Sequence, residues 1–429
     1  MADAPNAPAP DDPRAANAQS GVAATGPRRR FRRGVRAIGL VLAALVVLVI
    51  VVVVVVLQRA QPAQPGSFYS APSPLPSGPP GSIIRSEPLT DLPAGAHGWK
   101  ILYLSTSYTG KPTAISGMVI VPTTPAPPGG RKVVAWAQGT VGVASNCAPS
   151  LLGGAGAHVI DGLPVFLKAG DAVVATDYQG LGTPGPHPYL VGKAEAISVL
   201  DSVRAVHNLS AAGAGTTFVV WGVSQGGHAA LFTGQYAASY APDLKLVGVA
   251  AAAPASALIP LFQGKIGTDF GNLLAAFALD SWAQVYPALK LDQVVTAAAR
   301  PIVRNTATYC IHNMTQALPA VLHAKVLKIT FLSKKPWDIE PWKSELETNS
   351  AGHMPIRAPL YIGQGATDPL VLPAVQADFV KSLCAAGATV EYRTYPGVGH
   401  VDAGPAVVSD AAAWIADRFA GKPAPSTCG

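Results

Sequence analysis

Charged side chains are scarce in this sequence. Asp, Glu, Lys and Arg make up only 13% of the 429 residues, whereas hydrophobic residues make up 49%. Average globular chains are about 25% charged, and disordered chains combine high charge with few apolar residues. The scarcity therefore excludes a chain that is disordered throughout, and the length is enough for one large domain or two ordinary ones.

Cysteine is also scarce, with four residues, Cys147, Cys310, Cys384 and Cys428. None of them belongs to a closely spaced pair of the kind that zinc sites use, and the sequence contains no Cys-x-x-Cys. This pattern argues against a metal site. We expect neither a metal ion nor an organic cofactor.

The basic balance of the chain is local. Residues 1–60 contain eight arginines and three aspartates, which contribute +5 of the net charge of +7 and leave only +2 for the rest. A nucleic-acid-binding domain would carry its basic residues on a folded surface. We therefore expect no nucleic-acid partner and assign the arginines to membrane topology.

A run of 21 residues without charge, 37–57, follows most of these arginines. As a helix it measures about 31 Å, close to the hydrocarbon thickness of a bilayer. Signal-peptide apolar cores are about 7–15 residues long, so the run predicts an uncleaved transmembrane signal anchor. A soluble helix of this length would show a polar face. Cleavage near Ala60 or Ala63, which would release the protein, is the alternative.

The flanking charges set the expected orientation. Arginines at 28–30, 32–33 and 36 precede the run, and only Arg59 follows it closely. By the positive-inside rule, residues 1–36 form a disordered basic cytoplasmic tail and everything after Gln58 is exported. We expect a single-pass cell-membrane protein whose large C-terminal part lies outside the cytoplasm. The four exported cysteines then form two disulfides, for which three pairings are open.

Beyond the run, the chain changes character twice. Residues 58–81 are rich in Pro, Ser and Gly and predict a tether. In 82–253 and 356–429, short apolar runs alternate with helical stretches, which predicts an α/β core with a mainly parallel sheet. Predicted strands cover 101–108, 115–121, 132–137, 171–176, 244–250, 358–362 and 390–395, and predicted helices cover 193–209, 225–238, 374–386 and 405–419.

Residues 254–355 interrupt this alternation with mostly helical sequence. An insertion between consecutive sheet strands lies over the C-terminal edge of the sheet, where α/β proteins bind ligands. We expect a helical cap that shapes an apolar substrate pocket. The alternative is a helical elaboration that only packs against the sheet.

The most informative motif is Gly222-Val223-Ser224-Gln225-Gly226. It follows the β-branched, apolar run 218–221 and precedes a helical stretch. A strand, a Gly-x-Ser-x-Gly turn and a helix form the nucleophile elbow of the α/β-hydrolase fold, in which a sharp turn lifts the serine hydroxyl clear of the sheet. Backbones approach closely at such a turn, so the flanking positions require glycine. We expect Ser224 to be the nucleophile.

A serine nucleophile needs a base and a carboxylate that orients the base, in the chain order Ser, Asp or Glu, His. Asp368 follows the predicted strand that ends near Ile362, and His400 follows the strand that ends near Tyr395. Both lie at strand C-terminal ends, where an elbow serine can reach them. We expect Asp368 and His400 to complete the triad.

The competing residues fit less well. His228 lies on the helix directly after the serine, His187 is expected to be structural, and His312, His323 and His353 fall out of order in the inserted region. Asp402 is too close to His400 in sequence to brace it. Glu391 is expected on a strand.

The reaction also needs donors for the oxyanion of its intermediate. In this fold one donor is the backbone N–H of the residue after the nucleophile, here Gln225. The second comes from the loop after the strand 132–137. There, Gly139 permits close approach of the backbone and Thr140 offers a hydroxyl.

Several stretches together resemble the secretory lipase family, serine α/β-hydrolases that include the fungal lipase A type and bacterial relatives. They are Phe68-Tyr69, Pro79-Pro80-Gly81, Ile84-Arg85-Ser86-Glu87, Gly139-Thr140-Val141-Gly142, Asn146-Cys147-Ala148-Pro149-Ser150, the run 176–182 (TDYQGLG), the elbow, Thr367-Asp368-Pro369 and Gly399-His400. The resemblance covers about residues 68–418.

By position, the resemblance implies the triad Ser224, Asp368 and His400 and a lid or cap inserted before the acid. It also implies disulfides Cys147–Cys310 and Cys384–Cys428. The chain departs from the pattern at Gln138, where many α/β-hydrolases have His-Gly. Fungal members are thought to support the oxyanion with an acidic residue, for which this sequence shows no equivalent.

The expected function is hydrolysis of carboxylic esters, as a triacylglycerol lipase or carboxylesterase, through a serine acyl-enzyme. The apolar cap favours lipid or medium-chain acyl esters as substrates. Two alternatives stay open at this point. One is acyl transfer or peptide hydrolysis by the same triad, since the triad does not define the acceptor. The other is a catalytically inactive surface-binding protein on the same fold.

Overall fold

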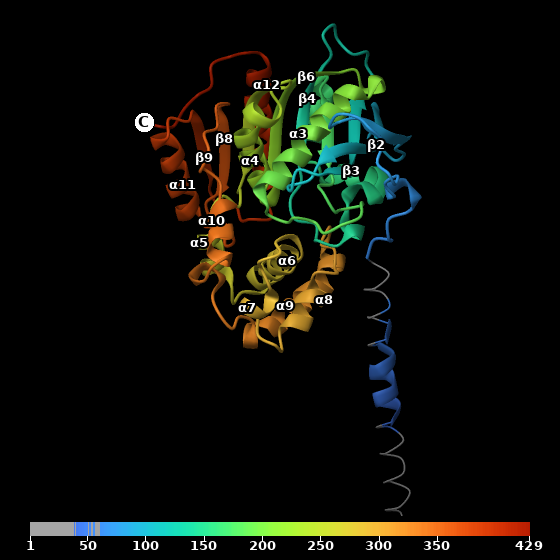
Figure 1. Ribbon diagram of the computed structural model, residues 1–429, viewed down its shortest axis with the longest axis vertical. Helices are drawn as coiled ribbons and strands as arrows, with labels where there is room; N and C mark the ends of the chain where they lie inside the picture. The colour runs from blue at the N-terminus through green and yellow to red at the C-terminus, as the bar shows by residue number, and fades with distance from the viewer. Residues whose placement is uncertain (1–37, 39, 50, 53–54, 56–60) are drawn as a thin grey trace, which may run out of the picture. The chain divides into compact units, whose positions relative to one another are not determined.

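Figure 1 shows the computed structural model, which describes residues 38, 40–49, 51–52, 55 and 61–429. The chain divides into two units, Met1–Val56 and Leu57–Gly429. The predicted cytoplasmic tail, 1–36, lies wholly outside the described residues. The predicted membrane anchor, 37–57, lies partly outside them.

The described part of the first unit contains the short helix Leu40–Val49, whose side chains are apolar and exposed. Among the described residues, no single helix is long and apolar enough to cross a membrane. One pair of helices, Ser145–Val159 and Leu163–Ala169, reaches that length and composition when taken together, with a bend of 76° between them.

The second unit is built on a nine-stranded sheet with the order β1-β2-β3-β5-β4-β6-β7-β8-β9. From β5 to β9 every neighbouring pair is parallel, whereas β1, β2 and β3 pair antiparallel. This confirms the predicted α/β-hydrolase fold with a mainly parallel sheet. The strands are β1 (Ile83–Pro88), β2 (Ala96–Thr106), β3 (Pro112–Pro122), β4 (Arg131–Ala137), β5 (Ala172–Thr176), β6 (Ala214–Val223), β7 (Lys245–Ala252), β8 (Leu360–Gly365) and β9 (Val390–Tyr395).

Side chains of the central strands are buried on both faces, because helices cover both. On β6, Phe218 and Val220 face one hydrophobic layer, and Val219 and Trp221 face the other. The first layer is closed by α3 (Gly192–Asn208), α4 (Gln225–Tyr240) and α11 (Pro373–Ala385), and the second by α2 (Leu163–Ala169) and α12 (Ala403–Phe419).

Between β7 and β8 the chain forms six α-helices and one short 3₁₀ helix, and the α-helices gather at one end of the sheet (Figure 1). They have a hydrophobic cluster of their own, which includes the buried side chains Leu273, Phe277, Trp282 and Trp342. The helices are α5 (Leu258–Lys265), α6 (Asp269–Val285), α7 (Leu291–Val294), α8 (Arg300–Thr306), α9 (Met314–Thr330) and α10 (Trp342–Thr348).

The segment that precedes β1 differs from the predicted tether. Phe68 and Tyr69, in a short 3₁₀ helix, are buried in a cluster with Leu102 of β2. The Tyr69 hydroxyl lies 3.0 Å from Ser150 Oγ, and Lys100 Nζ lies 4.1 Å from the centre of the Phe68 ring. Composition rich in Pro and Gly predicted a free chain, but these aromatic side chains bury enough apolar surface to fix it.

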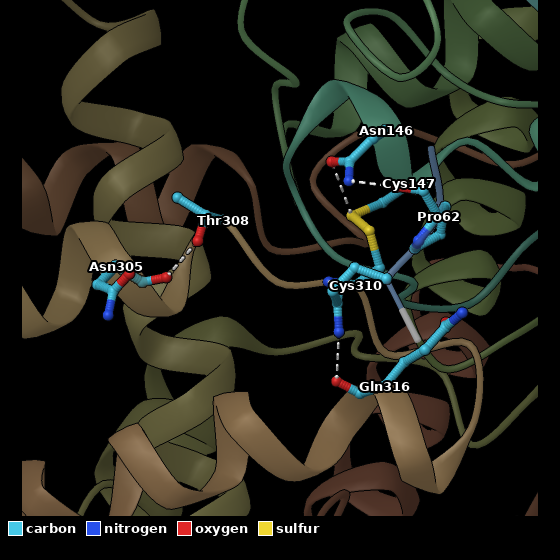
Figure 2. The surroundings of a disulfide bond; sticks show 8 residues. Pro62, Asn146, Cys147, Asn305, Thr308, Cys310 and Gln316 are labelled. Atoms are coloured by element: carbon cyan, nitrogen blue, oxygen red, sulfur yellow. Dashed lines mark hydrogen bonds between the residues drawn. A yellow bond between two sulfur atoms is a disulfide. The ribbon is translucent and has the colours of Figure 1, made fainter. Parts of the chain in front are cut away.

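The four cysteines form two disulfides. Cys147 pairs with Cys310, and Cys384 pairs with Cys428, which is the pairing that the family resemblance implies. The first bond joins the segment after β4 to the segment before α9 (Figure 2). The second ties the C-terminal tail to α11.

Candidate active site

Ser224 occupies the turn between β6 and α4 in a strained backbone conformation, with φ 59° and ψ −115°. Its N–H donates to the carbonyl of Ala252 on β7 at 2.9 Å. A side chain at Gly226 would place a Cβ 1.9 Å from the Ala137 carbonyl oxygen, and one at Gly222 would lie 2.3 Å from the Gly226 oxygen. Only glycine fits at both positions, which is the physical reason for the Gly-x-Ser-x-Gly pattern.

The structure brings the three residues of the predicted triad together. The two ring nitrogens of His400 contact the other two residues: Nε2 lies 2.9 Å from Ser224 Oγ, and Nδ1 lies 2.8 Å from Asp368 Oδ2. The Asp368 side chain is fully buried, and 13% of the His400 side chain is exposed. The histidine is therefore open to a substrate, and the carboxylate is shielded from water.

Backbone donors fix the Asp368 carboxylate. Its Oδ1 accepts the N–H groups of Leu370 and Val371 at 2.8 and 2.9 Å, and its Oδ2 accepts the side-chain amide of Gln364 at 3.2 Å. With Oδ2 also accepting from Nδ1–H of His400, the other ring nitrogen is left free to accept the serine proton. This geometry satisfies the requirement for a base-activated serine.

The residues that competed for these roles lie elsewhere. Glu391 is on β9 and forms an ion pair with Arg393 at 2.6 Å. Asp402 stands at the start of α12. His187 is buried, its Nδ1 lies 2.9 Å from the Gln179 carbonyl oxygen, and burial lowers its pKa.

A buried polar cluster that was not predicted from the sequence lies behind the elbow and is centred on Glu195 of α3. One carboxylate oxygen of Glu195 accepts from the Gln225 side-chain amide at 2.8 Å and from the Leu190 N–H at 3.1 Å. The other lies 2.6 Å from Nδ1 of His228, whose Nε2 lies 2.8 Å from the Asn349 carbonyl oxygen. The cluster thus joins the residue after the nucleophile to the segment after α10. An acidic residue within the apolar stretch 194–200 was the available signal.

The loop after β4 lies against the elbow. A Cβ on Gly139 would lie 3.3 Å from the Val223 carbonyl oxygen, so the two backbones nearly touch. The Thr140 hydroxyl lies 2.8 Å from that of Tyr189, which lines the pocket next to Ser224. Burial raises the pKa of Tyr189 far above its usual range, so this hydroxyl keeps its proton.

The departure at Gln138 has a structural explanation. Its side-chain amide donates to the backbone carbonyl oxygen of Asp177 at 3.2 Å. The backbone carbonyl of Gln138 accepts from the Tyr178 hydroxyl at 3.1 Å. These contacts bind the loop after β4 to the end of β5. Gln138 therefore holds the loop in place and does not line the pocket described below.

A narrow apolar pocket of about 30 Å³ lies over Ser224 and Gln225. Helices α5 and α6 contribute Leu261, Phe262 and Leu274 to its wall, and the loop after β8 contributes Val371. Two further polar residues, Tyr189 and Lys265, also line the pocket. The described part of the chain contains no group of three His, Cys, Asp or Glu residues arranged to hold a metal ion.

The family model "Secretory lipase" matches residues 160–427. Lipase 6 of Candida albicans is 26% identical over 392 residues, which cover 84% of this chain and 82% of the relative. A probable inactive lipase of Mycobacterium tuberculosis, MT1628, is 26% identical over 380 residues, or 83% and 82% of the two chains.

Solved structures share the fold. Candida antarctica lipase A in its closed state superposes with a TM-score of 0.70 at 22% identity and covers 86% of this chain and 91% of that one. The rice cell wall degrading esterase LipA of Xanthomonas oryzae gives 0.65 at 19% identity, covering 81% of this chain and all (100%) of the esterase.

Proposed function

Because the chain belongs to the secretory lipase family, we propose that it is a serine carboxylic-ester hydrolase that acts through a covalent acyl-enzyme. Ser224 is the nucleophile, His400 the base, and Asp368 the group that orients His400. One observation carries the proposal. An unbroken line of hydrogen-bond contacts runs from Ser224 Oγ through both nitrogens of His400 to a buried carboxylate, at 2.9 and 2.8 Å.

The geometry supports a two-step reaction. Ser224 Oγ attacks the ester carbonyl carbon while His400 Nε2 takes its proton, and Asp368 stabilises the imidazolium that results. The tetrahedral intermediate collapses when the C–O bond to the alcohol breaks, and the imidazolium gives its proton to the departing oxygen. Water then attacks the acyl-enzyme by the same route in reverse, which releases the acid and restores Ser224.

We assign the first oxyanion donor to the backbone N–H of Gln225 and the second to the segment Gly139-Thr140. The close approach of Gly139 to the elbow supports the second assignment. A hydroxyl at Thr140, held by Tyr189 at 2.8 Å, supplies a further donor. One such donor typically contributes about 10²–10³ in rate.

The apolar lining of the pocket over Ser224 favours lipid or medium-chain acyl esters as substrates. Its wall is mostly aliphatic and aromatic, with side chains such as Leu261, Phe262 and Leu274. An acyl chain has no polar groups to satisfy there, whereas a peptide would bury unpaired amides. Since α5 and α6 supply much of this wall, we propose that 254–355 act as a cap on a core formed by 82–253 and 356–429.

We also propose that 37–57 anchor the protein in the cell membrane, with the catalytic domain outside the cytoplasm. The support is the uncharged run of 21 residues and the arginines that precede it. Two disulfides in the domain agree with an oxidising compartment.

The test is the turnover of nitrophenyl esters by the full-length protein and its Ser224→Ala variant. Without the nucleophile, kcat should fall about 10⁵- to 10⁶-fold. Ser202→Ala is the matched control, because Ser202 is a buried serine on α3 whose hydroxyl donates only within its own helix, to Val199. Its turnover should match that of the unchanged protein.

Undiminished turnover in Ser224→Ala would exclude the proposed mechanism. A chain without measurable turnover, despite a folded domain, would instead place it with relatives such as the probable inactive lipase. The two results are distinct, and each contradicts the proposal.

A further inference from the structure

Helix α9 carries an apolar stripe on its outer face. Met314, Leu318, Leu322, Val326 and Ile329 are 75%, 42%, 46%, 50% and 82% exposed. Their spacing of four, four, four and three residues places them along one side of the helix. The stripe extends about 22 Å. Large apolar side chains scattered singly on a surface are ordinary, but a continuous row of this length marks a contact site.

Burial in the domain does not account for the stripe. The opposite face of α9 packs inward through Ala320, Ala324 and Leu327, which are fully buried among the helices between β7 and β8. The helix also has its own N-cap, because the Asn313 side chain accepts from the Gln316 N–H at 3.1 Å. The helix is therefore held in the domain without the stripe.

The charged residues of α9 and of the segment that follows it, up to residue 337, are all lysines. Residues 313–337 contain four lysines and no aspartate or glutamate. Lys325, Lys334 and Lys335 are exposed, and Lys328 forms an ion pair with Asp269 at 2.7 Å. A row of apolar side chains flanked by lysines is the pattern of a helix that lies in the interface of an anionic membrane.

The chain that follows the apolar run 37–57 is fixed beside the first turn of this helix. The Gln61 side chain donates to the Gln316 carbonyl oxygen at 3.0 Å and accepts from the Cys310 N–H at 2.8 Å. The carbonyl of Pro62 accepts from Asn146 at 3.1 Å. Figure 2 shows Pro62 and Gln316 near the disulfide Cys147–Cys310, which ties the segment after β4 to the segment before α9.

We propose that α9 is a second membrane contact, which docks its stripe and lysines on a bilayer with anionic headgroups. The inference rests on the proposed anchoring of 37–57. Only residues 58–60 separate that run from Gln61, and a chain of this length reaches about 14 Å at most. If the run spans a bilayer, the first turn of α9 must lie close to the membrane surface.

Docking of α9 has a consequence for the substrate. Helix α6 packs against α9 and also lines the pocket over Ser224, through Gly271, Leu274 and Ala275. One layer of helix therefore separates the proposed lipid contact from the pocket. A membrane-bound ester is the substrate class that this arrangement serves.

The test uses the full-length protein in vesicles of phosphatidylcholine with a minority of phosphatidylglycerol. Because the four native cysteines are paired in disulfides, a nitroxide attached to one added cysteine reports a single position. Leu322→Cys places it on the stripe. Lys381→Cys, on α11 with a side chain 78% exposed, is the control. The ratio of collisions with oxygen to collisions with a water-soluble nickel complex measures contact with lipid.

We expect this ratio to be several-fold higher at 322 than at 381. It should fall at 322 when Lys334→Glu and Lys335→Glu are introduced together, and stay unchanged with Lys381→Glu. Equal ratios at 322 and 381, in vesicles from which alkaline carbonate does not extract the protein, would overturn the docking while the anchor stands. Release by carbonate would overturn the anchor, and nitrophenyl ester turnover in the same sample would report on catalysis independently.

A second copy of the chain on the stripe would give a different result. The label at 322 would then be shielded from nickel equally well in vesicles without phosphatidylglycerol, and spin–spin broadening between labels would appear. Either observation contradicts the membrane contact.

Discussion

At the scale of single residues, the proposed reactivity of Ser224 depends on a few short contacts held by backbone groups. Ser224 lies in a strained backbone conformation that exposes its hydroxyl. The backbone N–H groups of Leu370 and Val371 donate to the Asp368 carboxylate. That carboxylate in turn contacts His400. The contacts that matter link residues 176 and 32 positions apart in sequence. Each therefore depends on strand ends that the sheet brings together.

Asp368→Asn should lower kcat for ester hydrolysis about 10⁴-fold with little loss of stability. The amide keeps the oxygen that accepts from Leu370 and Val371, but its NH₂ group faces His400 Nδ1 and favours the ring tautomer that cannot accept the serine proton. Steady-state kinetics and thermal unfolding measure both effects. Asp378→Asn, on the exposed side of α11, should leave both unchanged, and a drop of less than tenfold at Asp368 would argue against its role.

The protein should become less stable as pH rises, because the buried carboxyl group of Asp177 loses its proton. Burial raises its pKa from an ordinary value near 3.8 to about 6, although hydrogen bonds from Ser116 and Ser150 oppose the rise. The folded state therefore holds a proton that the unfolded state has already released between pH 4 and 6. The stabilisation is complete below the unfolded pKa and is lost as pH passes the folded pKa, a change of about 3 kcal/mol.

The measurement for Asp177 is urea unfolding between pH 4 and 7 for the unchanged protein and Asp177→Asn. The asparagine does not titrate, so the free energy of unfolding of the unchanged protein should fall relative to the variant as pH rises. Asp161 and Asp171, whose pKa values burial also raises, are present in both proteins and cancel in the difference. Parallel profiles would show that Asp177 does not titrate in this range.

At the scale of elements, the elbow is fixed by contact between β4 and the turn after β6. Gly226→Ala would place a Cβ against the Ala137 carbonyl oxygen and should cost at least about 3 kcal/mol of stability, because backbone has to move. Gly264→Ala on α5, whose Cβ would meet Leu372 at an ordinary 3.7 Å, is the control. Chemical denaturation of both variants measures the difference, and equal stabilities would contradict the packing.

Element types were largely predictable from sequence because periodicity reports burial directly. The predicted strand 132–137 and helix 193–209 match β4 (Arg131–Ala137) and α3 (Gly192–Asn208) closely. The elbow was predictable because a Cβ at Gly222 or Gly226 would clash with nearby backbone, so the local sequence must contain glycine. The contact of β5 with both β3 and β4 was not, because strand order depends on pairing between distant segments.

Other features could not be predicted from the sequence, for related reasons. Glu195 lies in the apolar stretch 194–200 of α3, and it meets its partners Gln225 and His228 only when α3 and α4 pack together. The Pro- and Gly-rich composition of the segment before β1 predicted a tether. Composition alone does not show that Phe68 and Tyr69 are buried in a hydrophobic cluster. The disulfide pairing came from the family resemblance and not from the residues themselves.

At the scale of the whole molecule, the two disulfides should contribute unequally. Cys147 and Cys310 are 163 residues apart, whereas Cys384 and Cys428 are 44 apart. If loop closure dominates, these bonds stabilise the folded state by about 5 and about 4 kcal/mol. The pair of variants Cys147→Ala/Cys310→Ala and Cys384→Ala/Cys428→Ala, compared by denaturant unfolding, should lose stability in that order, and the reverse order would contradict it.

The first disulfide also bears on the segment that follows the proposed anchor. This bond holds Cys310, whose N–H donates to the Gln61 side chain. Its loss should therefore loosen the contact between Gln61 and the start of α9. Contacts near Cys310 thus help to position the start of α9, and the ends of β6, β8 and β9 position Ser224, Asp368 and His400.

Covalent labelling distinguishes an activated Ser224 from an ordinary serine. A fluorophosphonate added to the full-length protein should phosphonylate one residue, identified by peptide mass spectrometry as Ser224, and should inhibit ester hydrolysis in step with labelling. His400→Ala should slow the labelling sharply, because no base then takes the Ser224 proton. Ester hydrolysis that continues while Ser224 stays unmodified, or labelling at another residue, would contradict the account.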